Sequence, residues 1–204
     1  MIGHLDSAQE FRLFLALAIP DGVKGAIQDA QAALRGVLPE KAARWTRCEQ
    51  FHLTVRFLGN VPASQLDELV AELRRVGASF SPLNMKAARI GFFPDARFPR
   101  VAWVGVNDLQ GQLSALWNAV QSATQPFTKE AAEPEFSGHV TLARVNRLRR
   151  EDAEKLAKCA ARFENTVFGE WTADQVELMR SELLPEGARH TVLATLPLLG
   201  REVP

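Results

Sequence analysis

The chain has 204 residues, of which 47% are hydrophobic and 24% are charged, a composition typical of one or two globular domains. Its 24 basic and 24 acidic residues cancel to a net charge of zero. This balance excludes a chain-wide cationic surface for duplex nucleic acid or an anionic membrane, but it is compatible with a local site for one phosphate group.

In the first half of the chain, strand patterns alternate with helix patterns. Residues 11–19 form an apolar run typical of a buried strand, and residues 23–37 carry apolar side chains at helical spacing. A short segment around Trp45 leads to a second predicted strand over residues 51–58, and residues 62–76 predict a second helix. Because the run at 11–19 is too short to span a bilayer and follows acidic residues, we expect neither a membrane segment nor a signal peptide.

In the second half, strands and helices mix without strict alternation, and neighbouring strands form hairpin-like pairs. This pattern favours an α+β fold with antiparallel sheets over a doubly wound parallel sheet. The predicted elements are, in chain order, strands at 85–93 and 101–106, a helix at 109–123, a loop at 124–138, a strand at 139–145, a helix at 151–163 and strands at 172–178 and 191–198.

The cysteines and histidines bear on the compartment and on metals. Cys48 and Cys159 lie far apart and in no CxxC spacing, which indicates two free thiols in a cytoplasmic protein. The four histidines form no metal-ligand cluster, and the sequence has no HExxH helix, P-loop or dinucleotide fingerprint. We therefore expect no metal and no cofactor.

One tetrapeptide pattern occurs twice. His52-Leu53-Thr54-Val55 and His139-Val140-Thr141-Leu142 both read His, apolar, Thr, apolar, lie 87 residues apart, and each falls in a predicted strand. Successive strand side chains point to opposite faces, so His and Thr at i and i+2 share one face while the apolar residues face the core. Two such strands facing each other would place two imidazoles and two hydroxyls around one small cavity.

These four side chains suit phosphoryl chemistry. The pKa of imidazole lies near 6.5, so one histidine can accept a proton from an attacking water while the other donates one to a leaving oxygen. Threonine hydroxyls can donate hydrogen bonds to phosphate oxygens, and nearby cations can stabilise developing charge. A structural role gives no reason for the same polar face to recur, and the repeat therefore favours catalysis.

The residues around the two motifs are similar to those of a known family. Residues 51–59 and 136–144 resemble its two motif regions, while residues 12–16, 178–183 and 193–198 resemble its opening and closing strands. On these residues the chain resembles the 2H phosphoesterase superfamily, named for its two His-x-Thr-x motifs. Within it, the chain is similar to the RNA 2′,3′-cyclic phosphodiesterases, also called 2′-5′ RNA ligases, over nearly its whole length.

The resemblance implies a fold and an activity. The expected fold is bilobal, with two pseudo-symmetric lobes of antiparallel sheet flanked by helices and a central cleft, formed by residues 11–200 as one domain after an N-terminal extension of residues 1–10. The expected activity is hydrolysis of RNA 2′,3′-cyclic phosphate ends to 2′-phosphomonoesters by a monomer acting on RNA termini or small cyclic nucleotides. Reversible 2′-5′ ligation, or nucleotide binding with little turnover, are the alternatives.

The resemblance also implies roles for single residues. His52 corresponds to the proton donor and His139 to the proton acceptor. Thr54 and Thr141 would hold phosphate oxygens. Arg144, five residues after His139, matches an arginine that the family uses at the phosphate.

Side-chain alternation along the strands favours a different arginine. In an ideal strand Arg144 has the opposite parity to His139 and faces away, unless a bulge or the strand end turns it back. Arg56 has the same parity as His52 and is therefore the cleft cation that geometry predicts. Further basic residues expected near the cleft are Arg44, Arg47 and Arg147.

His190 is the remaining histidine of the C-terminal half. It follows a Pro-Glu-Gly turn and stands where the family often has Tyr. We expect it to be structural or exposed and to take no part in catalysis.

Overall fold

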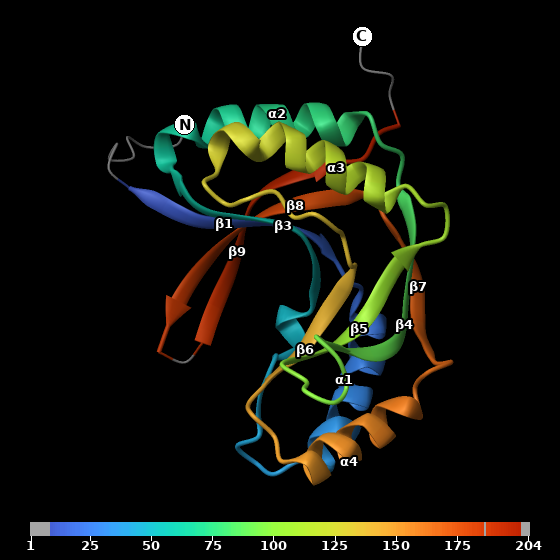
Figure 1. Cartoon of the computed structure of the whole chain (residues 1–204). Coiled ribbons are helices and arrows are strands. Elements are labelled where there is room, and N and C mark those ends of the chain that lie inside the picture. The colour runs from blue at the N-terminus through green and yellow to red at the C-terminus, as the bar shows by residue number, and fades with distance from the viewer. Residues whose placement is uncertain (1–8, 186, 201–204) are drawn as a thin grey trace.

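Residues 9–185 and 187–200, which a computed structural model describes, form two antiparallel sheets with helices on their outer faces (Figure 1). This arrangement confirms the predicted α+β class. The elements are β1 (Glu10–Ala18), α1 (Asp21–Gly36), β2 (Ala43–Trp45), η1 (Cys48–Gln50), β3 (His52–Pro62), η2 (Ala63–Gln65), α2 (Leu66–Ala78), β4 (Leu83–Phe93), β5 (Val101–Asp108), α3 (Leu113–Thr124), η3 (Gln125–Phe127), β6 (His139–Val145), α4 (Arg150–Ala161), β7 (Val167–Ala173), β8 (Gln175–Leu184) and β9 (Gly187–Pro197).

The two sheets repeat one plan. The first has the strand order β3-β1-β8-β9, and the second has the order β2-β6-β5-β4-β7, so β3, β1, β8 and β9 correspond to β6, β5, β4 and β7. Helices α2 and α3 lie side by side over the first sheet, and α1 and α4 lie against the second (Figure 1). The motif strands β3 and β6 hold equivalent positions, which gives the fold its pseudo-symmetry.

The hydrophobic spacing of the helices explains where they pack. On α1 the residues Val23, Ile27 and Leu34 fall on one side and are buried, and on α2 Leu69 and Leu73 are buried in the same way. Each fully buried leucine stabilises the fold by roughly 1.5–3 kcal/mol. The buried residues of both sheets form a single core cluster, which holds the two sheets in a fixed relation.

Several predicted elements differ from the structure. The helix predicted from residue 62 begins at Leu66, because β3 continues to Pro62 and the 3₁₀ turn η2 follows it. Helix α3 begins at Leu113 and not at residue 109, because Gly111 adopts a positive φ of 75° in a turn that precedes the helix. The predicted strand at 172–178 is divided: β7 ends at Ala173 in one sheet, and β8 begins at Gln175 in the other. Alternation of apolar residues does not reveal that the chain changes sheets at this point.

The described residues begin just before β1 and include both cysteines. β1 begins at Glu10, and residues 1–8 of the expected extension lie outside the described residues. Cys48 and Cys159 are free thiols. No helix in the described part of the chain is long and apolar enough to cross a membrane.

Candidate active site

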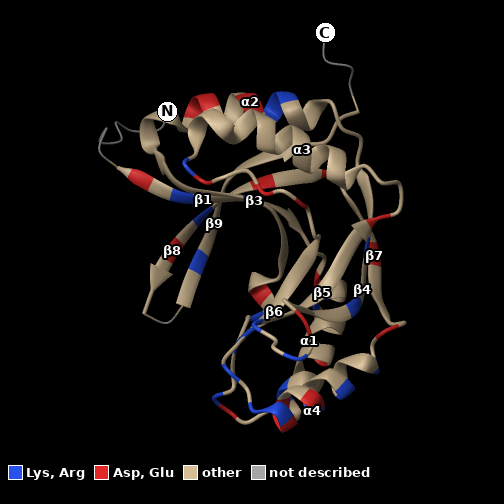
Figure 2. Cartoon of the chain, viewed as in Figure 1, with Lys and Arg blue, Asp and Glu red and all other residues tan. Residues whose placement is uncertain are grey.

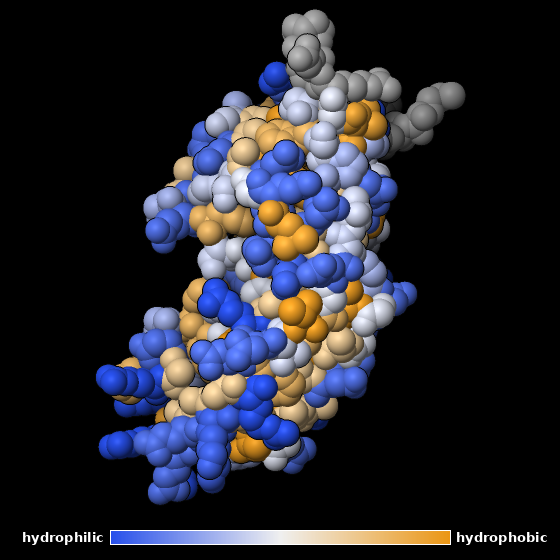
Figure 3. Space-filling model, turned by 90° about the vertical axis from the view of Figure 1, so that its right-hand side faces the viewer, coloured by the Kyte–Doolittle hydropathy of each residue, from blue (hydrophilic) through white to orange (hydrophobic). Residues whose placement is uncertain are grey.

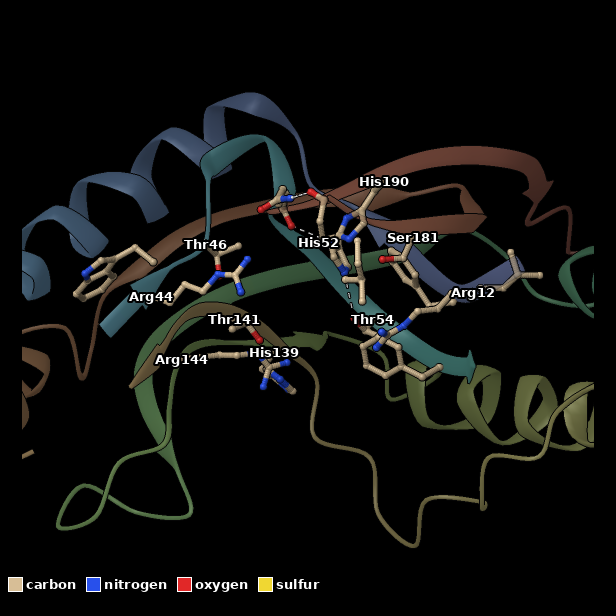
Figure 4. A pocket seen from close by; sticks show the side chains of 17 residues that line it. Arg12, Arg44, Thr46, His52, Thr54, His139, Thr141, Arg144, Ser181 and His190 are labelled. Atoms are coloured by element: carbon tan, nitrogen blue, oxygen red, sulfur yellow. Dashed lines mark hydrogen bonds between the residues drawn. The ribbon is translucent and has the colours of Figure 1, made fainter. Parts of the chain in front are cut away.

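A cavity of about 320 Å³ lies between the two sheets and contains both predicted motifs (Figure 4). Its walls come from β1, β2, β3, β6, β8 and β9, so residues from the two ends of the chain meet here. The structure places His52, Thr54, His139 and Thr141 together in its lining. The fold therefore brings the polar faces of the two motif strands together, as predicted.

Both motif histidines are held in the same way. Nδ1 of His52 lies 2.8 Å from the carbonyl oxygen of Gln50, and Nδ1 of His139 lies 2.7 Å from that of Ser137. Because a carbonyl only accepts, each Nδ1 carries the proton, and each Nε2 has a free lone pair when the ring is neutral. The Thr54 hydroxyl donates to Nε2 of His52 over 3.1 Å. The reactive atoms of the pair are therefore the two Nε2 atoms.

Aromatic neighbours restrict the orientation of both imidazoles. The ring of Phe14 lies 5.0 Å from that of His52, and the ring of Phe93 lies 5.0 Å from that of His139, measured between centroids. Just before His139, a side chain at Gly138 would collide with the carbonyl oxygen of Val106. A glycine here lets the chain pass close to β5 and enter β6 with the second histidine in place.

Equivalent bulges in β3 and β6 change which side chains face the cavity. In β3, Thr54 pairs with Ala16 and Arg56 with Leu15, so Val55 has no partner of its own. In β6, Thr141 and Ala143 pair with consecutive residues of β5, so Leu142 likewise has no partner. These two unpaired residues lie 87 positions apart, as the histidines do. An extra residue reverses the alternation beyond it.

As a result, the residue five positions after each histidine faces the cavity. Phe57 follows His52 and Arg144 follows His139 at this spacing, and both line the pocket. The alternation rule that turned Arg144 away holds only for a strand without a bulge. The structure thus places the arginine named by the family resemblance beside the second motif.

Arg56, predicted as a cleft cation, does not line this cavity: beyond the bulge its side chain turns away from His52 and Thr54 and lines a second, adjoining cavity. Arg56 is only 3% exposed and donates hydrogen bonds to the Oε1 atoms of Gln121 and Gln125, the latter over 3.1 Å. Gln121 in turn bonds the backbone N–H and C=O of Glu133. Arg56 therefore ties β3 to α3 and to the segment that leads into the second motif.

Replacing Arg56 with methionine is expected to destabilise the fold by roughly 1–3 kcal/mol, because it removes the two hydrogen bonds that the buried guanidinium donates to Gln121 and Gln125. Urea unfolding measures this free energy. As a control, Arg75→Met removes an exposed 2.8 Å ion pair with Glu72 and should cost about 0–1 kcal/mol. An Arg56→Met protein as stable as the Arg75→Met protein would show that these buried bonds contribute nothing.

Three arginines lie around the cavity and share no ion pair with an acidic residue in the described part of the chain. Arg44 lies directly opposite Arg144 in the β2–β6 pair, an arrangement that is destabilising for like charges. Arg12 reaches the same cavity from β1. None of the three forms an ion pair with any described residue. An anion bound between them would offset this repulsion.

The other charges are arranged differently. Helices α2 and α4 each carry both signs of charge, with the acidic residues of α2 toward its start and the basic ones toward its end (Figure 2), so the zero net charge reflects a mixed surface around a basic cavity. Of the other expected cleft cations, Arg47 pairs with Glu49 at 3.4 Å, and neither it nor Arg147 lines the cavity. On the face shown in Figure 3, apolar residues form small separate patches among hydrophilic ones.

His190 was expected to be structural or exposed, but it lines the cavity beside His52. The two rings meet edge to face with centroids 5.4 Å apart, and Phe14 contacts both. Burial, and then the charge of His190, lower the pKa of His52 from 6.5 to about 4. Burial and the charge of Arg47 also lower the pKa of His190.

The lowered pKa of His52 predicts a loss of stability in acid. The unfolded chain takes up a proton at this residue near pH 6.5, whereas the folded protein does so only near pH 4. Between these values the unfolded state binds more protons, so the free energy of unfolding falls as pH falls, by up to about 3 kcal/mol from this group. Urea unfolding at about pH 7 and about pH 4.5 should show the fall, and His52→Asn should reduce it. An identical fall in both proteins would contradict the assignment.

Sequence reasoning missed the cavity residues contributed by the chain termini. Arg12 and Phe14 come from β1, while Ser181 and His190 come from the β8–β9 hairpin. None belongs to a recurring pattern. The resemblance of the closing strands to those of the family was the one signal that pointed to the hairpin.

A second cavity of about 760 Å³ adjoins the first. Arg12, Phe57 and Arg144 line both. Among the residues for which the structure gives positions, no group of three His, Cys, Asp or Glu side chains could hold a metal ion. The arrangement as a whole provides two imidazole Nε2 atoms, two hydroxyls and three guanidinium groups around a space for an anion.

Comparison with known proteins identifies the fold and its relatives. The LigT-like phosphoesterase family matches residues 17–103 and again residues 104–190, two repeats of the same length as the motif spacing. An RNA 2′,3′-cyclic phosphodiesterase of Methanocaldococcus jannaschii is 29% identical over 89% of the chain and 98% of that protein. One of Thermus thermophilus is 30% identical over 93% of the chain and 91% of that protein.

Two solved structures have a similar fold. TT0787 of Thermus thermophilus superposes with a TM-score of 0.76 at 28% identity, covering 94% of this chain and all of that one. Escherichia coli LigT complexed with 3′-AMP gives a TM-score of 0.71 at 22% identity over 93% of this chain and 99% of that one. The second likeness concerns the fold alone.

Proposed function

The chain belongs to the LigT-like phosphoesterase family, and from this membership we propose that it hydrolyses 2′,3′-cyclic phosphate ends of RNA to 2′-phosphomonoesters by two-histidine acid–base catalysis without a metal. The observation that carries the proposal is the matched anchoring of His52 and His139, which leaves both Nε2 atoms to react in one cavity. The relatives named RNA 2′,3′-cyclic phosphodiesterase support the choice of substrate.

The reaction follows from this geometry. Nε2 of His139 takes a proton from a water molecule whose oxygen attacks phosphorus, and the bond from phosphorus to the ribose 3′ oxygen breaks. The protonated Nε2 of His52 gives its proton to that leaving oxygen. Each transfer contributes typically ~10²–10⁴-fold. Thr141 and Arg144 donate to the non-bridging oxygens as negative charge develops, and the Thr54 hydroxyl, which donates to Nε2 of His52 in the free protein, turns to these oxygens once that nitrogen is protonated.

The low pKa of His52 is compatible with the role of proton donor. In the free protein His52 is neutral at pH 7, because its pKa lies near 4. A cyclic phosphate carries a negative charge, and an opposite charge within about 4–6 Å favours protonation of the ring. Substrate binding itself thus supplies the protonated form that the donor needs.

We also propose that residues 11–200 act as one unit and that a monomer is active. The single core cluster supports the first statement, since it joins both sheets. The second is supported by the completeness of the site, because a single chain supplies both histidines, both threonines and the three arginines around the cavity.

The test is direct. The protein is incubated, with a chelator present, with an oligoribonucleotide that ends in a 2′,3′-cyclic phosphate. We expect a product that ends in a 2′-phosphate and a 3′-hydroxyl. Binding without product would favour a nucleotide-binding module, and a 3′-phosphate product would exclude His52 as the donor to the 3′ oxygen. Adding an RNA with a free 5′-hydroxyl tests ligation in the same assay.

A further inference from the structure

The β8–β9 hairpin carries different chemistry on its two faces. Glu182 pairs with Arg180 and with Arg189 at 3.0 Å each, so the charges of the outer face are satisfied among themselves. The inner face lines the catalytic cavity, and none of the described residues on this part of the wall carries a charged side chain. Its residues are two cross-strand pairs, Ser181 with His190 and Leu183 with Ala188.

His190 is the polar group of this wall without a partner. The two motif histidines each donate Nδ1–H to a backbone carbonyl, whereas neither ring nitrogen of His190 has a hydrogen-bond partner among the described residues. Burial and Arg47 lower its pKa, so at neutral pH the ring is uncharged. It then offers one donor and one acceptor. The Ser181 hydroxyl stands beside it on the neighbouring strand (Figure 4).

The wall also supplies apolar surface. Leu183 lines the cavity near the end of the hairpin and is 71% exposed, so its side chain has little protein to pack against. The hairpin is held against the first motif, because Nε2 of Gln50 donates to the carbonyl oxygen of Ala188 and the backbone of Gln50 holds His52. The position of this wall relative to the proton donor is therefore set by the fold.

The proposed reaction places the sugar on this side, and the inference rests on that proposal. In phosphoryl transfer the attacking and leaving oxygens lie roughly in line across phosphorus. The water is activated at His139, so the leaving ribose oxygen lies at His52. The nucleoside that carries this oxygen must then lie next to His52, where His190 and Ser181 are found (Figure 4).

We propose that the inner face of the β8–β9 hairpin is a nucleoside subsite, in which His190 and Ser181 form hydrogen bonds to the sugar and base while the arginines across the cavity hold the phosphate. The uncharged wall suits an uncharged nucleoside, and the basic wall suits the anion. His190 is accordingly a binding residue for the nucleoside and takes no part in the proton transfers.

Two ligands separate this subsite from the phosphate site. Inorganic phosphate fills only the phosphate position, whereas 2′-AMP, a nucleoside 2′-phosphate of the kind the reaction releases, fills both. Affinities are measured by calorimetry at pH 8, where His52 and His190 are neutral in the free protein because the pKa of each lies below 6.5. The wild-type protein should bind 2′-AMP more tightly than phosphate.

The variants remove the polar groups one at a time. His190→Phe keeps an aromatic ring and should weaken 2′-AMP roughly three- to tenfold, the value of one neutral hydrogen bond, with phosphate affinity unchanged. Ser181→Ala should also weaken the binding of 2′-AMP. His190→Gln should bind 2′-AMP more tightly than His190→Phe does. Arg189→Gln on the outer face is the matched control and should change neither affinity.

The outcomes are distinct. Loss of affinity for 2′-AMP alone supports the subsite. Equal loss for both ligands, no loss for either, or equal wild-type affinity for the two ligands would overturn it while leaving the proposed reaction intact. A wild-type protein that binds neither ligand and turns over no cyclic phosphate would instead contradict the proposed function.

Discussion

Replacing either His52 or His139 with alanine is expected to lower kcat for a 2′,3′-cyclic phosphate by about 10²–10⁴-fold. In the proposed mechanism, His139→Ala removes the base that takes the proton from water, and His52→Ala removes the acid that protonates the leaving oxygen. Both act in the same step. Residues that act as a unit are non-additive, so the double variant should lose little more than the worse single variant.

The assay measures initial rates with a cyclic-phosphate oligonucleotide at saturating concentration. Circular dichroism and thermal unfolding check that each variant folds, and binding of inorganic phosphate checks that the arginine wall is intact. Activity within about tenfold of wild type in either variant would contradict the assigned acid–base pair. A double variant whose loss equals the product of the single losses would argue against a concerted step.

Arg144→Gln is expected to lower kcat/KM by about 10²–10³-fold, the usual effect of removing one donor to a developing oxyanion. The bulge at Leu142 turns this guanidinium into the cavity, where it faces Arg44 across the β2–β6 pair and no acidic residue with a described position pairs with it. Stability should be unchanged or slightly higher, because the substitution removes a like-charge contact.

The matched control for Arg144→Gln is Arg147→Gln. Arg147 is exposed, lies three residues further along the chain and does not line the cavity. It should leave kcat/KM within about twofold, since its charge is largely screened by solvent. An equal loss in the two variants would show that general basicity, and not a contact from Arg144, supports the reaction.

Much of the fold and the centre of the site could be predicted from the sequence. The apolar periodicities located the helices and most strands, because burial on one face is a local property of the chain. The two His-x-Thr-x motifs predicted a shared cavity, because i and i+2 side chains share a strand face. The family resemblance supplied the bilobal arrangement that no local pattern contains.

The residues that were misplaced show where local reasoning fails. Arg56 and Arg144 exchanged their expected positions because a single extra residue, Val55 in β3 and Leu142 in β6, reverses the alternation. A bulge depends on the partner strand, so strict alternation in one strand cannot reveal it. His190 was expected to be structural or exposed because it follows a Pro-Glu-Gly turn, whereas its position in the cavity depends on a hairpin that packs against a motif far away in the sequence.

The net charge of zero does not show how the charges are distributed over the molecule. It sums mixed surface charges with a compact group of arginines around the cavity, Arg12, Arg44 and Arg144. A total cannot report that distribution. Long RNA should therefore bind weakly with a shallow salt dependence, because only a few phosphates contact basic side chains.

The measurement that tests the central claim most directly is a crystal structure of the protein soaked with 2′-AMP. The account predicts that the phosphate lies between the imidazoles, within hydrogen-bond distance of Nε2 of both His52 and His139. A phosphate bound elsewhere, for example in the adjoining cavity near Lys129, or two imidazoles that cannot reach one phosphate, would contradict it.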